Sequence, residues 1–262
     1  MQRNSSRKIV ASVCAALMLA LEIFGVSGLL IPYSTEEVGI RFNTLVYPYR
    51  YMLLLGFLAD FLIFLYLLYS FGMLGKAKTD PERQFVHFTD VGLILLATVK
   101  AVDTYFWHYG LFGLCIIFRV LMLLILLRIN LAFQSVLGRR KGIYWPRWPF
   151  DIYWGYCQYL LVLALGTAMT AWPWGDQIFT PGARAVLLLL ALATLSMVTG
   201  LRQLNPVSML TVVIIEGLIT AQHLLPEPAY DGRFPEVYIA SILSMAALVA
   251  SILAALIKRR RN

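Results

Sequence analysis

The sequence has few charged residues, few cysteines and no long polar stretch. Charged side chains make up 14% of its 262 residues, whereas soluble domains average about 25%. No polar stretch is long enough for a soluble domain, so a single membrane domain over 1–262 is expected. Cys14, Cys115 and Cys157 all lie in apolar segments, which is typical of small buried hydrophobes rather than disulfides or metal ligands. No nucleophile–base pair, metal-spaced cluster or phosphate loop occurs, so the protein is predicted not to be an enzyme.

Apolar residues dominate the chain, at 60% of its composition, with a mean hydropathy of +0.74. Eight apolar segments each approach the ~20 residues that a helix needs to span the hydrocarbon core. They run over residues 9–31, 48–72, 88–107, 110–132, 149–171, 183–201, 206–225 and 236–257. The predicted fold class is therefore all-α, a polytopic transmembrane bundle of about eight helices in a lipid bilayer.

Lysine and arginine are distributed unevenly between the connections. Of the 22 Lys and Arg residues, 15 fall at the two termini and in the connections 73–87, 133–148 and 202–205, and four fall in the alternate connections. Cytoplasmic loops carry the excess of positive charge, so both termini are predicted to be cytoplasmic. The same clustering beside apolar segments accounts for the net charge of +8, and no nucleic-acid partner is expected.

Ionisable residues inside the apolar segments are the most informative feature. Each costs about 2.5–3.5 kcal/mol at a helix centre on translocon scales, so such residues normally face the bundle interior or a cavity. They are Glu22, Asp60, Lys100, Asp103, Arg119 and Glu216. From the rise per residue, Asp60 and Glu216 are expected near mid-depth and the other four toward the outer half. Lys100 and Asp103 share one helix face and are placed to pair directly, with Arg119 close by on the next helix.

Two interpretations of these charges stay open. They form either a structural ion-pair network that fixes helix registry, or the polar lining of a ligand cavity, an ion path or a partner interface. Asp90, Arg128 and Asp151 lie close enough to the cytoplasmic interface to snorkel or cap, and need no special role. In the last segment, Ala246, Ala250 and Ala254 recur every four residues, a spacing that favours close helix contact in lipid.

Several short motifs agree in order and spacing with a known family. The segment 105–110 reads Tyr-Phe-Trp-His-Tyr-Gly, an aromatic helix end before a short turn. The segment 148–156 begins with Trp-Pro and contains a Gly-aromatic pair, and Asn205-Pro206 enters the seventh segment. With Pro48 and Tyr51 after the first segment, the chain resembles the TspO/translocator-protein family, in particular its longer bacterial branch of tryptophan-rich sensory proteins.

The resemblance implies a five-helix core over approximately 9–171, with three additional helices over 183–257. In this family the core encloses a pocket for porphyrins, sterols or similar apolar ligands, and many members dimerise. It also implies a bacterial plasma (inner) membrane, and a homo-oligomer or a larger membrane complex as possible assemblies. Aromatic residues expected to line the cavity or an interface are Tyr51, Trp107, Tyr153, Trp154 and Tyr156.

This sequence departs from the family at its pocket positions. Leu55 stands where the second helix usually has Trp, and Lys100 and Asp103 stand where the third usually has Asn and Trp; Ala164 and Ile215 replace a further Asn and Trp. A tetrapyrrole cofactor is thus possible by resemblance but disfavoured by these residues. The leading prediction is a sensor or transport-type protein that binds a small apolar ligand in the bundle. The alternatives are a non-enzymatic accessory or scaffold subunit of a larger membrane complex, and a proton- or ion-coupled carrier.

Overall fold

The computed structural model describes residues 2–27, 33–42, 44–48, 52–74, 80–137, 145–172, 178–226 and 230–261. Over these residues the chain forms nine α-helices, a short 3-10 helix at Trp145–Arg147 and no strand. The helices are α1 (Gln2–Ser27), α2 (Thr35–Arg41), α3 (Met52–Ser70), α4 (Asp80–His108), α5 (Phe112–Leu137), α6 (Trp148–Ala171), α8 (Pro181–Gln203), α9 (Pro206–Leu224) and α10 (Pro235–Arg261). Each of the eight predicted segments falls on one of the long helices, which confirms the all-α bundle.

Seven of the described helices are long and apolar enough to cross a membrane, judged by length and composition. The remaining long helix, α3, offers a shorter apolar stretch over Leu54–Ser70. Its 19 residues still reach about 28 Å at 1.5 Å per residue, close to the ~30 Å of the hydrocarbon core. The chain is therefore a multi-span integral membrane protein.

Helix ends are where the structure departs from the predicted segments. α4 begins at Asp80 rather than at 88, and α1 begins at Gln2 rather than at 9. Polar first turns continue a helix beyond the hydrocarbon, and hydropathy does not register them. The short α2 was not predicted; Ser34 and Glu37 cap it reciprocally, as in a capping box. The hydrogen bonds from Ser34 lower the pKa of the Glu37 carboxyl.

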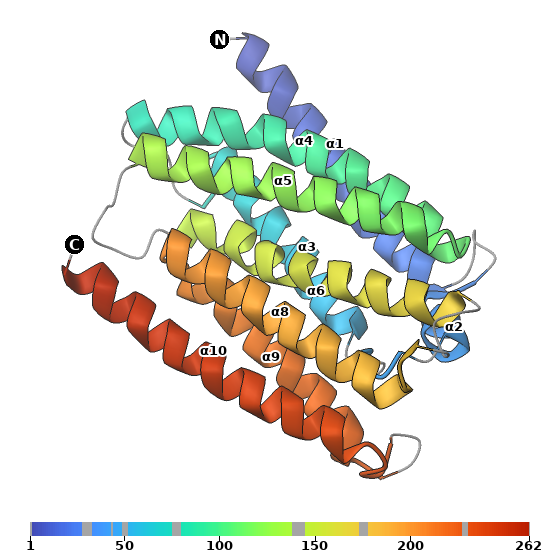
Figure 1. The fold of residues 1–262 in the computed structure, drawn as a ribbon. Helices are drawn as coiled ribbons and strands as arrows, with labels where there is room; N and C mark the ends of the chain where they lie inside the picture. The colour runs from blue at the N-terminus through green and yellow to red at the C-terminus, as the bar shows by residue number, and fades with distance from the viewer. Residues whose placement is uncertain are drawn as a thin grey trace.

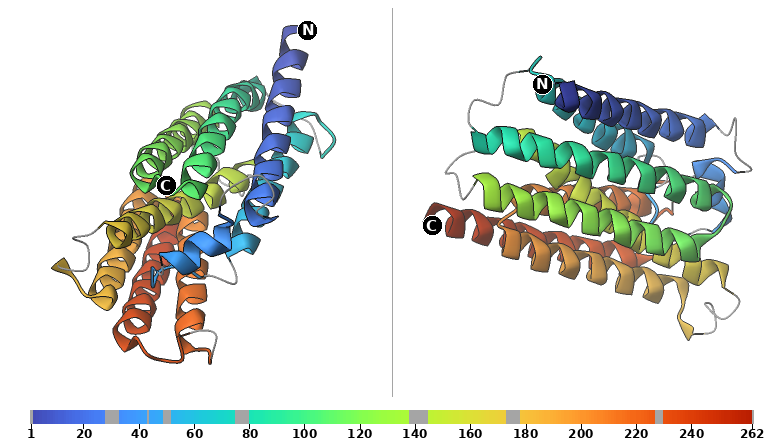
Figure 2. Two further views of the ribbon diagram at one scale, coloured as in Figure 1. Left: turned by 90° about the vertical axis from the view of Figure 1, so that its right-hand side faces the viewer. Right: turned by 90° about the horizontal axis from the view of Figure 1, so that it is seen from above.

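α6 is the central helix of the bundle (Figure 1). It contacts α3, α5, α8 and α9, and 78% of its span is buried, the largest share of any candidate span. On one side α1, α4 and α5 follow one another, and on the other α10 packs across α8 and α9 (Figures 1 and 2). The two termini lie toward the same end of the bundle (Figure 2), as an even number of spans requires.

Close packing of α6 against α9 depends on a glycine. A Cβ added at Gly155 would lie 2.6 Å from the backbone oxygen of Ser208, so a larger residue would push the helices apart. The turn before α9 places Leu204 in the left-handed region (φ 49°), and the Asn205 side chain then caps the helix by accepting from the Ser208 N–H. Of the three C-terminal helices, α8 and α9 thus dock directly on α6, and α10 packs on α8 and α9. Their separation from a five-helix core stays a prediction.

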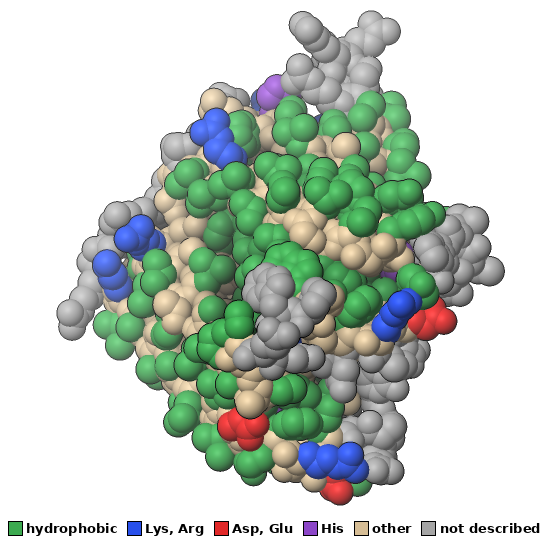
Figure 3. All heavy atoms as spheres, turned by 45° about the vertical axis from the view of Figure 1, so that its right-hand side comes forward, with side chains coloured by type: hydrophobic (Ala, Val, Ile, Leu, Met, Phe, Trp, Pro, Cys, Tyr) green, Lys and Arg blue, Asp and Glu red, His purple; other side chains and the backbone are tan. Residues whose placement is uncertain are grey.

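The outer surface fits a lipid environment. Hydrophobic side chains cover most of the flank in Figure 3, and the visible charged side chains gather toward its borders. Large apolar side chains on α1, α3, α5 and α10, among them Leu17, Leu54, Ile117 and Leu243, are about half exposed or more. A water-soluble protein rarely exposes so continuous an apolar surface.

Candidate functional site

A lysine held by two acids lies at the junction of α1, α3 and α4. The Lys100 Nζ donates to Asp60 Oδ2 at 2.7 Å, and it lies 3.1 Å from Glu22 Oε2. Lys100 and Asp60 are each 5% exposed. Asp60 lies eight residues after the start of α3 and Lys100 eight residues before the end of α4, so the two side chains share one depth. Three helices are therefore tied together by one buried cation.

Aromatic side chains of α6 close this lysine centre, which comprises Glu22, Asp60, Lys100, Tyr153 and Tyr156. The Lys100 Nζ lies 5.8 Å from the centroid of the buried Tyr153 ring, within cation–π range. The rings of Tyr153 and Tyr156 are 6.1 Å apart in an edge-to-face arrangement.

Gly56 makes room for the lysine centre. A Cβ added there would lie 2.3 Å from Glu22 Oε1 and 3.1 Å from the Tyr156 hydroxyl. Gly56 precedes Asp60 by four residues, so both face the centre from one side of α3. Sequence reasoning did not single out Gly56. Its position four residues before Asp60, an acid predicted to be buried, was the sequence feature that could have identified it.

Two buried polar atoms in the lysine centre lack a hydrogen-bond partner among the described residues: Asp60 Oδ1 and the Tyr153 hydroxyl. Tyr153 is 0% exposed. Buried polar groups in proteins are paired as a rule, and an unpaired one costs about 1–3 kcal/mol. These two atoms are therefore available to a hydrogen-bonding group from outside the chain.

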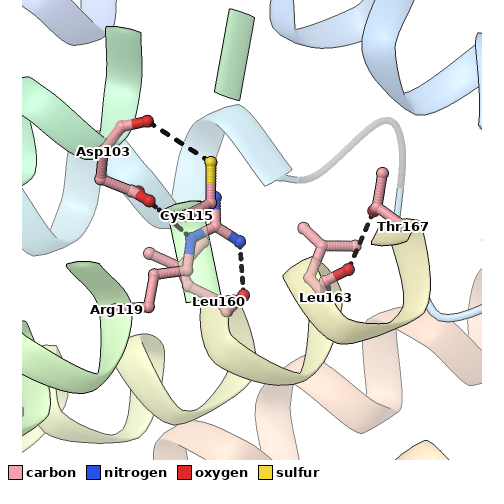
Figure 4. Close-up of polar contacts among 6 residues, drawn as sticks. All are labelled: Asp103, Cys115, Arg119, Leu160, Leu163 and Thr167. Atoms are coloured by element: carbon pink, nitrogen blue, oxygen red, sulfur yellow. Dashed lines mark hydrogen bonds and ion pairs between the residues drawn. The ribbon is translucent and has the colours of Figure 1, made fainter. Parts of the chain in front are cut away.

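A second ion pair joins α4 to α5 and α6 (Figure 4). The Arg119 Nε donates to both carboxylate oxygens of Asp103 at 3.1 Å, and its Nη1 donates to the backbone oxygen of Leu160. The guanidinium carbon lies 4.5 Å from the centroid of Trp107, one turn after Asp103 on α4. Cys115 donates weakly to the Asp103 backbone oxygen at 3.8 Å. Hydrogen bonds join the polar groups of this arginine centre, which comprises Asp103, Cys115, Arg119 and the Leu160 backbone oxygen. They hold α4, α5 and α6 together.

The predicted direct pair between Lys100 and Asp103 is wrong. Lys100 pairs with acids of α1 and α3, whereas Asp103 pairs with Arg119. The two residues do share a stretch of α4, but each points to a different neighbouring helix. Five of the six predicted polar residues thus gain partners on other helices, and they form two adjacent ion-pair centres: Glu22, Asp60 and Lys100 in the first, and Asp103 and Arg119 in the second.

Glu216 does not join either centre. It is fully buried on α9 against α10, where the Ser241 hydroxyl donates to its backbone oxygen at 2.8 Å. Both oxygens of its carboxyl group lack a partner within the described part of the chain. Among the predicted aromatic residues, Trp154 turns toward α8, with its Nε1 donating to the Thr199 hydroxyl at 3.5 Å. Tyr51 lies outside the described residues.

Asp151 has a larger role than the predicted interfacial cap. It is buried, pairs with Arg147 Nε at 2.9 Å, and accepts from the Asn205 Nδ2 at 2.6 Å. Since Asn205 also caps α9, this contact fixes the start of α9 against the start of α6. The motif residues 148–156 and 205–206 therefore meet at one end of the bundle.

The lysine centre and the neighbouring arginine centre together carry more acidic than basic side chains. Across the described residues, no group of three or more His, Cys, Asp or Glu side chains is placed to hold a metal ion. Three carboxylates, those of Glu22, Asp60 and Asp103, face two cations in the two centres. A surplus of negative charge favours a ligand that carries a hydrogen-bond donor or a positive charge.

Comparison with known proteins places the chain in one family. The model of a family described as TSPO-like protein matches residues 8–258, which is nearly the whole chain. No curated protein and no solved structure matches it. The match includes all eight long helices, so the three C-terminal helices belong to the matched unit as much as the first five.

Proposed function

The chain belongs to the TSPO-like protein family, and we propose that it is a non-enzymatic membrane protein that binds a small, largely apolar ligand at the lysine centre. A sensing or transport role accompanies this binding. The lysine centre lies among α1, α3, α4 and α6, where a pocket was expected from the family resemblance. Its ion pair replaces part of the aromatic wall that the family's pocket has, so the ligand that we propose differs from the family's porphyrins and sterols.

The observation that carries the proposal is the pair of unpartnered atoms, Asp60 Oδ1 and the Tyr153 hydroxyl. They belong to side chains that otherwise contribute to one buried cluster around Lys100. A ligand that hydrogen-bonds to both would remove two desolvation penalties at once. Such penalties are a common reason for a buried polar site to prefer one ligand over an analogue that lacks the matching group.

The preferred ligand has an apolar body and a donor group. Aromatic rings of Tyr153 and Tyr156 suit an apolar or aromatic body, and Asp60 suits an ammonium or hydroxyl donor. A porphyrin fits poorly, because its flat apolar ring would displace the partner of Lys100 and its propionates would face the acids. We therefore expect tetrapyrroles to bind weakly or not at all.

A matched pair of probes tests this ligand chemistry by calorimetry on the detergent-solubilised protein. 1-Naphthylmethylamine and 1-naphthylacetate share one ring system and carry opposite charges. The amine should bind one-to-one and about tenfold more tightly than the acetate, since a charge-assisted hydrogen bond contributes about 1.5–3 kcal/mol. Protoporphyrin IX should give no saturable binding.

Two variants locate the binding. Asp60→Asn should abolish the preference for the amine, while Glu216→Gln, which removes a buried acid distant from the centre, should leave it intact. Equal affinity for amine and acetate, or saturable porphyrin binding at low micromolar concentration that Lys100→Ala removes, would contradict the proposal.

The orientation that we propose has both termini in the cytoplasm. The support is the concentration of 15 of the 22 Lys and Arg residues at one set of connections, together with the two termini lying toward the same end of the bundle. Cytoplasmic loops of membrane proteins carry this excess of positive charge.

A second candidate function is that of an accessory subunit, and the surface of α10 favours it. Ala246, Ala250 and Ala254 are exposed along its outer face. Small residues at this spacing allow close approach of another helix in lipid. Ala250→Phe should then release a partner or dissociate an oligomer in mild detergent, whereas Leu121→Phe, on the exposed face of α5, should not. A monomeric, partner-free wild-type protein would exclude this role.

A further inference from the structure

A groove of about 350 Å³ runs along the outer surface between α4 and α5, which pack side by side (Figure 1). Its walls are apolar and include Phe88, Val91, Leu95 and Ile125. Gly92 also lines it; a Cβ added there would lie 2.8 Å from Ile129. The glycine therefore allows α4 and α5 to approach each other closely at the groove.

Two basic side chains, His87 and Arg128, line the same groove. His87 lies four residues inside the α4 span, and Arg128 lies six residues before the end of the α5 span. These offsets correspond to depths of about 6 Å and 9 Å below the ends of the spans. Long basic side chains at such depths extend toward the headgroup layer. The apolar part, by contrast, continues toward the membrane centre past Val91 to Leu95 and Ile125.

We propose that this groove binds one anionic phospholipid, with the headgroup phosphate at Arg128 and His87 and an acyl chain along Val91, Leu95 and Ile125. The site is separate from the lysine centre and does not depend on the function proposed for it. Charge complementarity selects an anionic headgroup over a zwitterionic one. This end of the bundle also carries most of the Lys and Arg residues, and the leaflet on the cytoplasmic side is the one rich in anionic lipid.

The surrounding acids leave Arg128 available to a phosphate. No described carboxylate lies within ion-pair distance of Arg128. Asp90, three residues after His87 on α4, is buried and accepts a hydrogen bond from Ser70 on α3, which does not line the groove. A second copy of the chain seated symmetrically in the groove would bring like charges together, which is unfavourable. A lipid satisfies both the apolar walls and the Arg128 guanidinium.

Native mass spectrometry of the full-length protein tests the proposal with palmitoyl-oleoyl phosphatidylglycerol and phosphatidylcholine, which share their acyl chains. Phosphatidylglycerol should be retained preferentially. Arg128→Gln should weaken the binding of phosphatidylglycerol about fivefold and leave the binding of phosphatidylcholine unchanged. Arg128→Lys should keep most of the preference for phosphatidylglycerol. Arg202→Gln, an exposed arginine at the same end of the bundle, is the matched control and should have no effect. Val91→Trp should fill the groove and lower the retention of both lipids.

Other outcomes would overturn the proposal in distinguishable ways. Equal retention of the two lipids, unaltered by Arg128→Gln, would mean that the groove has no headgroup specificity. Competition by millimolar inorganic phosphate would mean a site for a free anion instead of a lipid. If Val91→Trp dissociates a dimer and leaves phosphatidylglycerol in place, the groove is covered by a second copy. Circular dichroism on each variant confirms that the fold is retained.

Discussion

Replacing Lys100 with methionine should destabilise the protein by about 3–5 kcal/mol, because the change leaves a buried acid without its cation. The structure makes Asp60 the stranded partner, since it is 5% exposed and bonded to Lys100 at 2.7 Å. Glu22 loses the same cation, but its side chain is 18% exposed, so leaving it unpaired costs less free energy. Methionine keeps the length and apolar body of lysine, so the loss reports the charge rather than a cavity.

Two double variants distinguish the observed pairing from pairing within α4. Lys100→Met with Asp60→Leu removes both charges of the buried pair, and should recover at least about 2 kcal/mol of the loss. Lys100→Met with Asp103→Leu should give no recovery, because it strands Arg119 as well. The free energy of unfolding of this double variant should be about 3 kcal/mol lower than that of Lys100→Met alone.

Unfolding in mixed micelles with increasing SDS measures these differences, followed by tryptophan fluorescence and circular dichroism. The coupling energy between positions 100 and 60 is the quantity compared with that between positions 100 and 103. A large rescue by Asp103→Leu, with none from Asp60→Leu, would refute the assignment of partners. Equal behaviour of both double variants would show that the lysine is not specifically paired.

Three further predictions concern the rest of the fold. Glu216→Gln should leave the melting temperature unchanged or raise it, because an amide of the same shape replaces a buried carboxyl group whose two oxygens have no partner among the described residues; a marked fall would mean that a cation pairs with this carboxyl group. Arg119→Lys should lose about 1.5–3 kcal/mol, because an ammonium cannot keep both contacts with Asp103 and the bond to α6; stability equal to wild type in the SDS titration would contradict this. Reporter fusions at Asn4 and Asn262 should both report the cytoplasm, and opposite sides would refute the even number of spans.

The long helices could be predicted from the sequence because hydropathy reports the length of chain inside the hydrocarbon. Their ends could not, since the first turns of α1 and α4 are helical yet polar. The short α2 has too few residues for any periodic signal, and its capping pair Ser34 and Glu37 becomes meaningful only once a helix is assumed there. Propensity and capping signals are weak beside tertiary packing.

The site was predictable in part. Burial of Asp60, Lys100, Asp103 and Arg119 followed from their position in apolar segments, and the structure confirms that all four are buried. Their partners did not follow, because spacing along a helix says nothing about which helices flank it. α1 and α3 supply the acids for Lys100 across long sequence separations. The acids and bases were visible in the sequence, and their pairing depends on how the helices pack.

The measurement that tests ligand binding at the lysine centre most directly is the affinity of Tyr153→Phe for 1-naphthylmethylamine, taken beside its stability. The substitution removes one buried hydroxyl that has no partner among the described residues and keeps the ring over Lys100. We expect the affinity to fall about fivefold, as for one lost hydrogen bond, while the free energy of unfolding stays the same or rises. Unchanged affinity, or a loss of affinity matched by an equal loss of stability, would contradict it.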